Sequence, residues 1–243
     1  MSLIATVGLI PCSVLGAGAA AAAEDQVPRR EVFGGVETAS NYATVYAGGG
    51  YAFGGGFYEP GWRIRAVGAW GAYNYNRTLF DGSAYSDTTF NGRVAFLSAQ
   101  VGYQFHQGRT IVAGFIGMEA VDQAVSPFDP GNAIQGTELG LRLTLETWTD
   151  ISDLWFLSAD GGYGTAFQEY WQLSRIGYRL GSVFAVGAEG GVLGNQEYDA
   201  GRVGGFIRGT FNAVEATVSA GFSGEYLLGD PGGYASVNLY RKF

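Results

Sequence analysis

LGLRLTLETW, residues 139–148, alternates apolar and polar side chains with a period of two. Leucines occupy every odd position from 139 to 145, whereas Arg142, Thr144 and Glu146 fall between them. Because successive side chains of a β-strand point to opposite faces, the stretch predicts a strand with one apolar and one charged face. An apolar face that points outward indicates a membrane barrel, whereas one that points inward indicates a soluble sandwich.

The composition favours one long all-β domain. Of the 243 residues, 47% are hydrophobic and only 15% are charged, and 41 Gly stand against 6 Pro. The single cysteine, Cys12, lies in the N-terminal apolar stretch. The mature chain therefore holds no disulfide framework and no cysteine-based metal site.

The charges argue against a nucleic-acid partner and for enclosed polar faces. The formal net charge is -8, whereas nucleic-acid binding depends on basic patches. Of the 14 basic residues only Lys242 is a lysine, and the others are arginines. Soluble sheets guard their edges with lysine, whereas arginine suits confined sites with several hydrogen bonds. We therefore expect the charged faces to line a space walled by protein.

The N-terminus predicts export. Residues 1–23 are uncharged, mostly apolar and end in a run of alanines, which is typical of a signal peptide cleaved after Ala23. No basic residue precedes Arg29, so an uncleaved anchor is the alternative. We expect residues 24–30 to form a periplasmic segment and residues 31–243 a barrel, because no second apolar run is long enough for a membrane helix.

The alternation recurs in segments of about ten residues, the length with which a tilted strand crosses a bilayer. Examples are 97–105, 155–163, 184–189 and 214–222. Read backwards from the C-terminus, the connections alternate between long and short, and a strand at residues 31–38 makes the number even. The prediction is an all-β, antiparallel up-and-down transmembrane β-barrel of twelve strands. Ten strands is the alternative if the first pair lies outside the barrel.

Glycine is common on the polar faces, where it would leave room for long side chains that reach across a crowded lumen. We expect three arginines to face four carboxylates there, in a register that the sequence does not give. The candidate lumen-facing residues are Arg142, Glu146, Asp160, Glu189, Arg202, Arg208 and Glu215.

Aromatic residues make up 15% of the chain, and many stand where strands meet loops. Girdles of aromatic side chains at the two membrane interfaces would have this distribution. The expected girdle residues are Trp62, Tyr73, Tyr75, Trp148, Trp155, Tyr170, Trp171 and Tyr240.

The expected outer loops are acidic and carry further aromatic residues. Such aromatic faces could contact a neutral glucan, but ordinary solvated loops would look the same. The candidate glycan-contacting aromatics are Phe80, Tyr85, Phe128, Tyr198 and Tyr226.

Little in the sequence supports catalysis. The only histidine, His106, is expected in the short turn HQGR, which leaves no partner set for a catalytic triad or a histidine-rich metal site. Asp150 and Asp153 fall in the segment TDISD, where aspartate satisfies the backbone of a turn. We expect no catalytic residue, no metal ligand and no cofactor.

Several stretches resemble one family. FGGVETASNYATVYAGGGYAF from Phe33, GWRIRAVGAWGAYNY from Gly61, SPFDPGNAIQGTELGLRLTLETW from Ser126 and GNQEYDAGRVGGFIRG from Gly194 are similar to the cellulose biosynthesis protein BcsS family of Gram-negative bacteria. The resemblance implies a secreted outer-membrane barrel that works beside a cellulose synthase system. Its implied partners are outer-membrane lipid and either cellulose or periplasmic cellulose-export components, and it implies no catalytic residue and no oligomeric state.

Three hypotheses follow. The first is a non-enzymatic outer-membrane barrel that assists cellulose or exopolysaccharide secretion as a passage, an anchor or a partner of the export machinery. The second is a barrel enzyme that acts on lipid or polysaccharide. The third is a soluble secreted β-sandwich, which membrane fractionation would distinguish from the other two.

Overall fold

The computed structural model describes residues 27–80, 82–225 and 232–243. The predicted signal peptide (1–23), residues 24–26 of the predicted periplasmic segment and the loop residue Tyr226 lie outside these ranges. Among the described residues, no helix is long and apolar enough to span a membrane.

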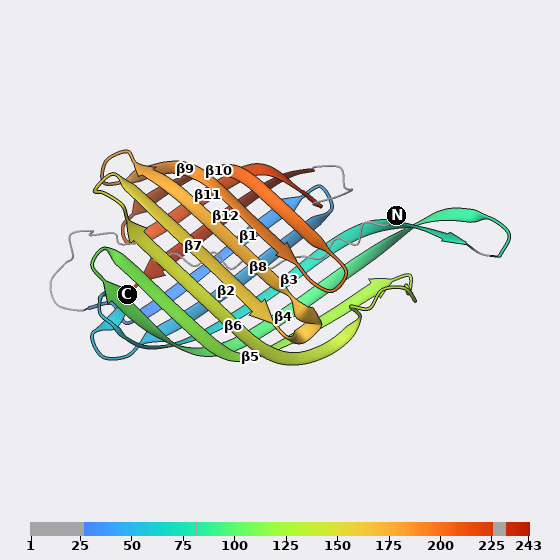
Figure 1. Cartoon of the computed structure of the whole chain (residues 1–243), viewed down its shortest axis with the longest axis horizontal. Coiled ribbons are helices and arrows are strands. Elements are labelled where there is room, and N and C mark those ends of the chain that lie inside the picture. Colours follow the sequence, from blue (N-terminus) through green and yellow to red (C-terminus); the bar gives the residue numbers. More distant parts are fainter. Residues whose placement is uncertain (1–26, 81, 226–231) are drawn as a thin grey trace.

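The described chain forms a closed barrel of twelve strands, each antiparallel to its neighbours (Figure 1). The strands are β1 (Arg30–Ala39), β2 (Tyr42–Ala52), β3 (Gly61–Phe80), β4 (Tyr85–Gln107), β5 (Thr110–Ser126), β6 (Gly136–Asp150), β7 (Trp155–Gly164), β8 (Tyr170–Arg179), β9 (Phe184–Gly194), β10 (Asp199–Phe211), β11 (Val214–Glu225) and β12 (Gly232–Lys242). The predicted twelve-stranded up-and-down barrel is therefore confirmed.

The first strand closes the barrel. Val36 on β1 lies opposite Val45 on β2 and also opposite Val237 on β12. Without β1, the backbone edges of β2 and β12 would be unpaired, and hydrocarbon offers no water to satisfy them. The strand that was predicted only from the need for an even number is thus part of the wall, and the ten-stranded alternative is excluded.

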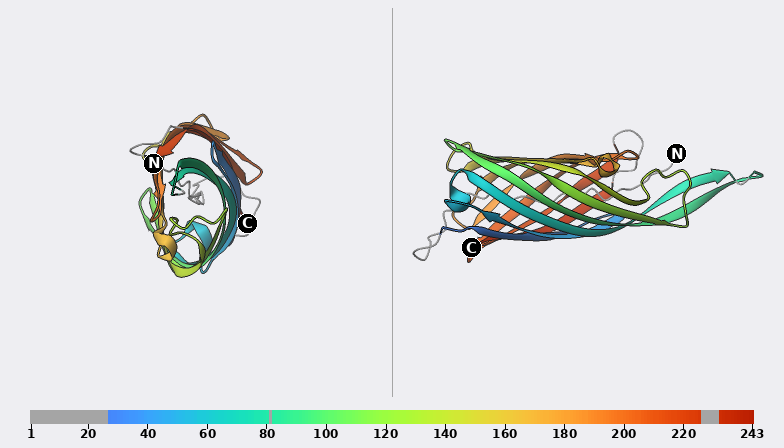
Figure 2. Two further views of the ribbon diagram at one scale, coloured as in Figure 1. Left: turned by 90° about the vertical axis from the view of Figure 1, so that its right-hand side faces the viewer. Right: turned by 90° about the horizontal axis from the view of Figure 1, so that it is seen from below.

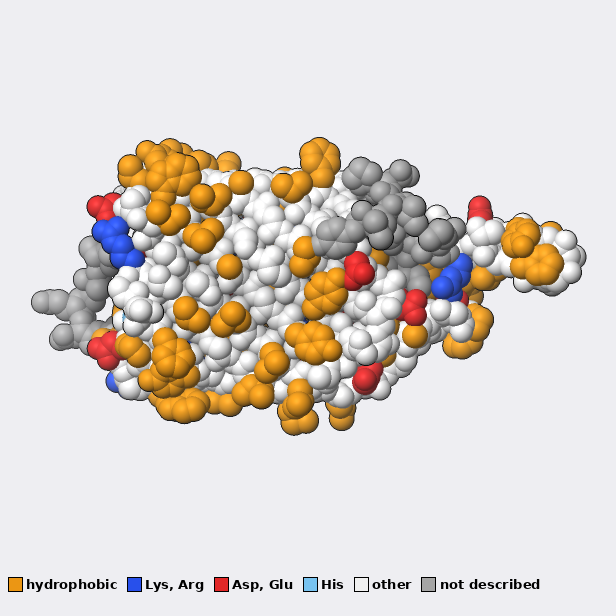
Figure 3. All heavy atoms as spheres, viewed as in Figure 1, with side chains coloured by type: hydrophobic (Ala, Val, Ile, Leu, Met, Phe, Trp, Pro, Cys, Tyr) orange, Lys and Arg blue, Asp and Glu red, His pale blue; other side chains and the backbone are white. Residues whose placement is uncertain are grey.

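The barrel is apolar outside and polar inside. On β6 the four leucines from 139 to 145 are exposed, with Leu139 at 71%, whereas Arg142, Thr144 and Glu146 are buried. Exposed hydrophobic side chains are spread along the visible wall, and the visible charged ones lie toward its two ends (Figure 3). Because an apolar outer band is what a bilayer demands of a barrel, the leucine face is the lipid face.

The two ends of the barrel differ. At one end, here called the terminus end, β4 ends at Gln107 and β5 begins at Thr110, and the backbone N–H of Arg29 donates to the carbonyl of Phe243. The other end, here called the hairpin end, carries the β3–β4 hairpin, which projects far beyond the rest of the wall (Figure 2). Both described termini therefore lie away from that hairpin.

The projecting hairpin corrects the expected loop at residues 76–89. The pairing of β3 with β4 continues without interruption to Phe80 and Tyr85, and the strands have 20 and 23 residues. Only about ten residues are needed to cross a bilayer, so half of this hairpin stands outside it. Threonine and aromatic residues, which favour strands, extend the pairing where the polar composition suggested a loop.

The girdle prediction was wrong for most of its residues. Trp62 and Trp155 are exposed on the outer wall, and Tyr170 is half-buried. The other five are buried inside the barrel, namely Tyr73, Tyr75, Trp148, Trp171 and Tyr240. Their positions have the inward parity of their strands, so parity outweighs nearness to a strand end.

Candidate functional site

Charged bonds cross the lumen between strands that are not neighbours. Glu146 on β6 accepts hydrogen bonds from both Nη atoms of Arg65 on β3, one of them at 2.9 Å. Arg65 Nη2 also lies 3.5 Å from a carboxylate oxygen of Glu31 on β1. Asp160 lies opposite Glu146 in the register of β6 and β7, and it is buried as well. These contacts place buried charged side chains from four strands, β1, β3, β6 and β7, inside the barrel.

A second cluster surrounds Glu189 on β9 and is here called the Glu189 cluster. Arg175 Nε and Arg202 Nη2 donate to its carboxylate at 2.8 and 3.2 Å. The hydroxyls of Ser219 and Tyr234 donate to the same two oxygens at 2.9 and 2.8 Å. A buried carboxylate with four donors fixes the arginines around it.

Arg202 connects this cluster to the first strand of the barrel. Its Nη1 lies 2.7 Å from Glu37 Oε2 on β1, and the Tyr42 hydroxyl donates to the other oxygen of Glu37 at 2.5 Å. Two strands, β11 and β12, separate β10 from β1 along the wall. The bond is therefore a brace across the seam of the barrel.

All seven predicted lumen residues lie on inward faces of their strands. Arg202 meets Glu189, and Arg208 Nε lies 3.2 Å from Glu215. Arg142 pairs with Glu119 at 3.2 Å, a residue absent from the predicted set.

Sequence reasoning missed six charged lumen residues. They are Glu31, Glu37, Arg63, Arg65, Glu119 and Arg175. A usable signal was present, because WRIR at 62–65 alternates apolar and basic side chains just as the β6 stretch does. The period-two rule, applied to every strand, would have placed these residues inside.

A short 3-10 turn, η1 (Gly56–Tyr58), closes the terminus end. Phe57 is buried beneath it, with the Arg63 guanidinium 4.1 Å from the ring centre. The turn is held by Gln104 Nε2, which donates to the Phe57 carbonyl at 3.0 Å, and by the Phe57 N–H, which donates to the Pro28 carbonyl. The Phe57 ring is therefore held in a fixed, buried position at this end of the barrel.

A second turn, η2 (Ala166–Gln168), connects β7 to β8 at the hairpin end. The N–H of Ala166 donates to Glu119 at 3.1 Å, and that of Phe167 donates to Glu138 at 3.0 Å. Phe167 adopts a left-handed backbone with φ 51°, which costs about 1 kcal/mol for a bulky residue. Its buried ring joins Ile134, from the β5–β6 loop, in one apolar cluster.

Glu169, which follows η2, is buried without a hydrogen bond to its Oε1 among the described residues. Burial raises the pKa of this carboxyl from 4.5 to about 7, although Arg142 opposes the shift. The turn at the hairpin end is thus sensitive to pH.

The predicted outer-loop aromatics occupy three different settings. Phe80 and Tyr85 face each other at the tip of the hairpin, 59% and 77% exposed, with ring centroids 5.0 Å apart. Phe128 is 75% exposed in the β5–β6 loop. Tyr198 is half-buried against the apolar cluster inside the barrel, which leaves it little surface for a ligand.

The residues weighed for catalysis serve the wall and its turns. β4 continues to Gln107, so His106 lies at a strand end and not in the expected turn, with Nε2 2.5 Å from Gln104 Nε2. Asp150 and Asp153 form ion pairs with Arg179 and Arg109. In the described part of the chain, no group of three or more His, Cys, Asp or Glu side chains is arranged to hold a metal ion.

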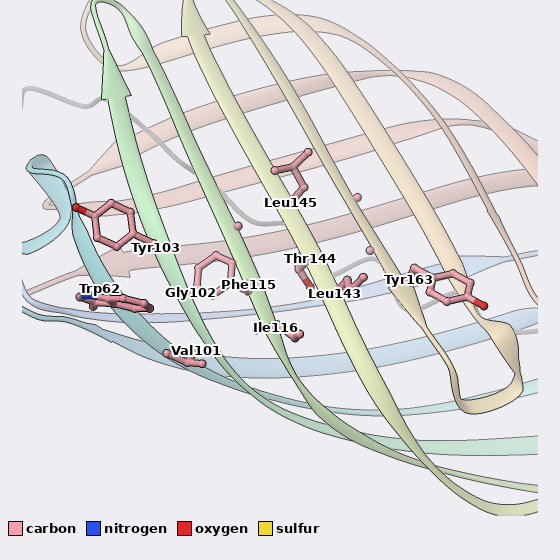
Figure 4. Close-up of a pocket in the computed structure, with 13 residues that line it drawn as sticks. Trp62, Val101, Gly102, Tyr103, Phe115, Ile116, Leu143, Thr144, Leu145 and Tyr163 are labelled. Carbon is pink, nitrogen blue, oxygen red and sulfur yellow. The ribbon is translucent and has the colours of Figure 1, made fainter.

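The lipid-facing wall carries a shallow hollow of about 580 Å³ (Figure 4). Trp62 and Tyr103 lie at one end of it and Tyr163 at the other, with Leu143 and Leu145 between. An apolar hollow on this wall opens to hydrocarbon and not to the lumen.

An apolar outer wall around a charged, side-chain-filled interior defines a transmembrane barrel of the outer-membrane type. The particular family follows from the sequence. The family described as cellulose biosynthesis protein BcsS matches residues 32–243, and the chain belongs to this family. No curated protein of similar sequence was found.

Solved outer-membrane barrels share the fold at low identity. The KdgM porin in complex with disordered oligogalacturonate is 10% identical, with TM-score 0.51, and the match covers 88% of this chain and 99% of that one. The CymD monoaromatic hydrocarbon channel is 8% identical, with TM-score 0.52 and coverages of 90% and 89%. The transport unit of the autotransporter AIDA-I from Escherichia coli has the same identity and score, with coverages of 90% and 91%.

Proposed function

We propose that this protein is a non-enzymatic outer-membrane barrel that anchors secreted cellulose at the cell surface. The choice of cellulose as the polymer rests on membership of a cellulose biosynthesis family. The observation that carries the choice of an anchor is the pair of bonds across the lumen, Arg65 to Glu146 and Arg202 to Glu37. A passage for a glucan chain would have to break both, whereas an anchor needs a rigid wall and an accessible outer end.

The cost of opening the lumen supports this choice. Removal of one partner from a buried ion pair typically costs about 3–5 kcal/mol, because the other charge stays buried. A passing chain would separate several such pairs at once and would also displace Phe57 and Phe167 from the two ends. No such cost arises if the polymer stays outside.

The proposed orientation places the hairpin end outside the cell. Bacterial outer-membrane barrels have short turns on the periplasmic side and longer connections outside. The two described termini and the short β4–β5 turn share one end here, and the long β3–β4 hairpin stands at the other. Phe80 and Tyr85 would then face the medium.

Deletion of the gene tests the anchor. We expect total cellulose to stay unchanged while the polymer moves from the cell surface into the medium. Lower total cellulose or polymer retained in the periplasm would contradict the anchor and favour a role in synthesis or passage. A copy with His106→Ala should restore surface cellulose as well as wild type, and its failure would favour the enzyme hypothesis.

Channel recordings test the filled lumen separately. The purified protein, inserted into planar lipid bilayers, should give no steady ion conductance, while an open porin recorded alongside conducts. A stable ohmic conductance of the wild-type protein would show that the bonds across the lumen do not block it. The passage hypothesis would then replace the anchor.

A further inference from the structure

The outward face of the projecting hairpin is a regular ladder of polar pairs closed by two aromatic rings. Three cross-strand pairs follow one another, Asn74 with Asn91, Asn76 with Thr89, and Thr78 with Asp87. Phe80 and Tyr85 complete the series at the tip. These eight residues are here called the hairpin ladder.

Every member of the hairpin ladder is exposed. Two of its three polar pairs are joined by side-chain bonds between the strands, since Thr89 Oγ1 donates to Asn76 Oδ1 at 2.7 Å and Thr78 Oγ1 donates to Asp87 Oδ1 at 2.6 Å. An ordered surface loses less conformational freedom when a ligand binds than a mobile loop does. The ladder is therefore prepared for binding.

The opposite face of the same hairpin is already occupied. Arg77 points inward and bonds Asp129 of the β5–β6 loop at 2.8 Å, and the Tyr75 hydroxyl donates to the same carboxylate. The loop supports the hairpin from behind, and Phe128 belongs to that side. The hairpin ladder, in contrast, faces away from this loop and is exposed.

The chemistry of the hairpin ladder selects a neutral, hydroxyl-rich ligand. Asparagine and threonine both donate and accept hydrogen bonds, as sugar hydroxyls do, and five of the six polar members carry no charge. The one charged member, Asp87, would repel anionic polymers, as would the net charge of the chain. Aromatic faces pack against the C–H faces of a sugar ring whose hydroxyls point sideways.

We propose that the hairpin ladder binds a single extended chain of a neutral β-linked glucan. The inference rests on the proposed function, since it names the part of the anchor that touches the polymer. The rings of Phe80 and Tyr85 hold a sugar face at the tip, and the amides and hydroxyls below bond the hydroxyls of the following sugars. Each step along the strand places the next outward side chain about 7 Å further on.

A protein partner is the competing occupant. Beyond Tyr73 and before Asn91 the outer edges of the hairpin have no neighbouring strand in the described structure, and unpaired edges can accept an added strand. Backbone pairing would use these edges and would depend little on the ladder side chains. The experiment below separates the two.

The test is titration of the full chain, purified in detergent micelles, with cellohexaose and with oligogalacturonate. Wild type should bind cellohexaose and not the anionic oligomer. The variant F80A/Y85A and the variant N76A/T89A should each weaken cellohexaose binding by about tenfold or more. Heat-dependent gel mobility shows that each variant is folded.

Two matched controls define the face. Ser86→Ala changes the inward face of the same hairpin, and Phe128→Ala removes an equally exposed ring from the loop behind it. Both should bind like wild type. Equal losses in controls and ladder variants, no binding by wild type, or concentration-dependent self-association without sugar binding would overturn the proposal.

The two proposals fail differently. If the ladder variants lose cellohexaose but deletion of the gene leaves surface cellulose unchanged, the binding site stands and the anchoring function falls. If deletion releases cellulose but the ladder variants restore it fully, anchoring stands and the hairpin ladder is not its contact.

Discussion

Arg202 on β10 and Glu37 on β1 meet across the lumen, with Nη1 and Oε2 2.7 Å apart. Arg202 also donates to Glu189, so one guanidinium on β10 connects β1 to β9. Charges on a membrane barrel are costly on the outside but stable inside when they are paired. The interior thus stabilises the wall by ionic bonds as well as by its buried apolar clusters.

Loss of Glu189 should destabilise the barrel strongly. Glu189→Ala removes a bonded carboxylate from both Arg175 and Arg202 in the buried interior, at a cost of about 3–5 kcal/mol. Urea unfolding in lipid vesicles measures it. Asp153→Ala is the control, because that carboxylate is 90% exposed and its pair contributes about 0–1 kcal/mol. Similar losses of unfolding free energy in the two variants would contradict a stabilising role of the Glu189 cluster.

Glu169 should make stability depend on pH. Its folded pKa of about 7 lies above the ordinary 4.5, so stability falls as pH rises from 4.5 to 7 and then levels off. Glu169→Gln stays neutral and should raise the melting temperature at pH 8 but not at pH 4, with a free-energy gain of up to about 3 kcal/mol. Heat-dependent gel mobility at the two pH values checks this. The same shift at both pH values would exclude ionisation as the cause.

The lipid face can be tested on the opening stretch. Leu143→Arg places a charge on the outer wall near the middle of β6, where arginine costs about 2–4 kcal/mol. Unfolding from vesicles should show the loss. Ser86→Arg, on the exposed part of the hairpin, should leave the free energy of unfolding unchanged. If Leu143→Arg were equally harmless, the leucine face would not be in hydrocarbon.

Two neighbouring glycines should respond in opposite ways to alanine. A Cβ at Gly102, on the inward face of β4, would lie 2.4 Å from both the Gly114 carbonyl and the Phe115 ring. Gly102→Ala should therefore cost about 1–3 kcal/mol in the free energy of unfolding. A Cβ at Gly114, on the outer face of β5, would meet open space, so Gly114→Ala should be neutral or slightly stabilising. A loss at Gly114 equal to that at Gly102 would contradict the crowded lumen.

The period-two pattern predicts the fold because, in a barrel wall, alternate side chains of each strand point to the lumen and to the lipid. The outward leucines of β6 follow from that rule alone, whereas the first strand followed from the even number of strands in such barrels. The rule was not applied to Trp148, which was expected in the aromatic girdle. Trp148 shares the parity of Glu146 and packs inside, where its ring stacks on that of Phe156 with centroids 4.4 Å apart. The bond between Arg65 and Glu146 could not be predicted from the sequence. It joins strands three apart, and that meeting depends on the tilt and stagger of the closed barrel.

The sequence did not predict the long β3–β4 hairpin, for a different reason. Its residues are polar, so they read as a loop, but pairs such as Thr78 with Asp87 satisfy each other across two strands. Such pairing appears only when the register is known.

The Tyr240 hydroxyl donates to Glu31 at 2.9 Å, although 209 positions separate the two residues. Contacts between the ends of a chain form last and slow folding most. The seam strands carry Glu31, Glu37 and Tyr240, so the ionic interior is complete only after the final strand arrives. Closure of the barrel and completion of its internal charge pairing are therefore one event, since the strands that meet at the seam also supply the carboxylates for Arg65 and Arg202.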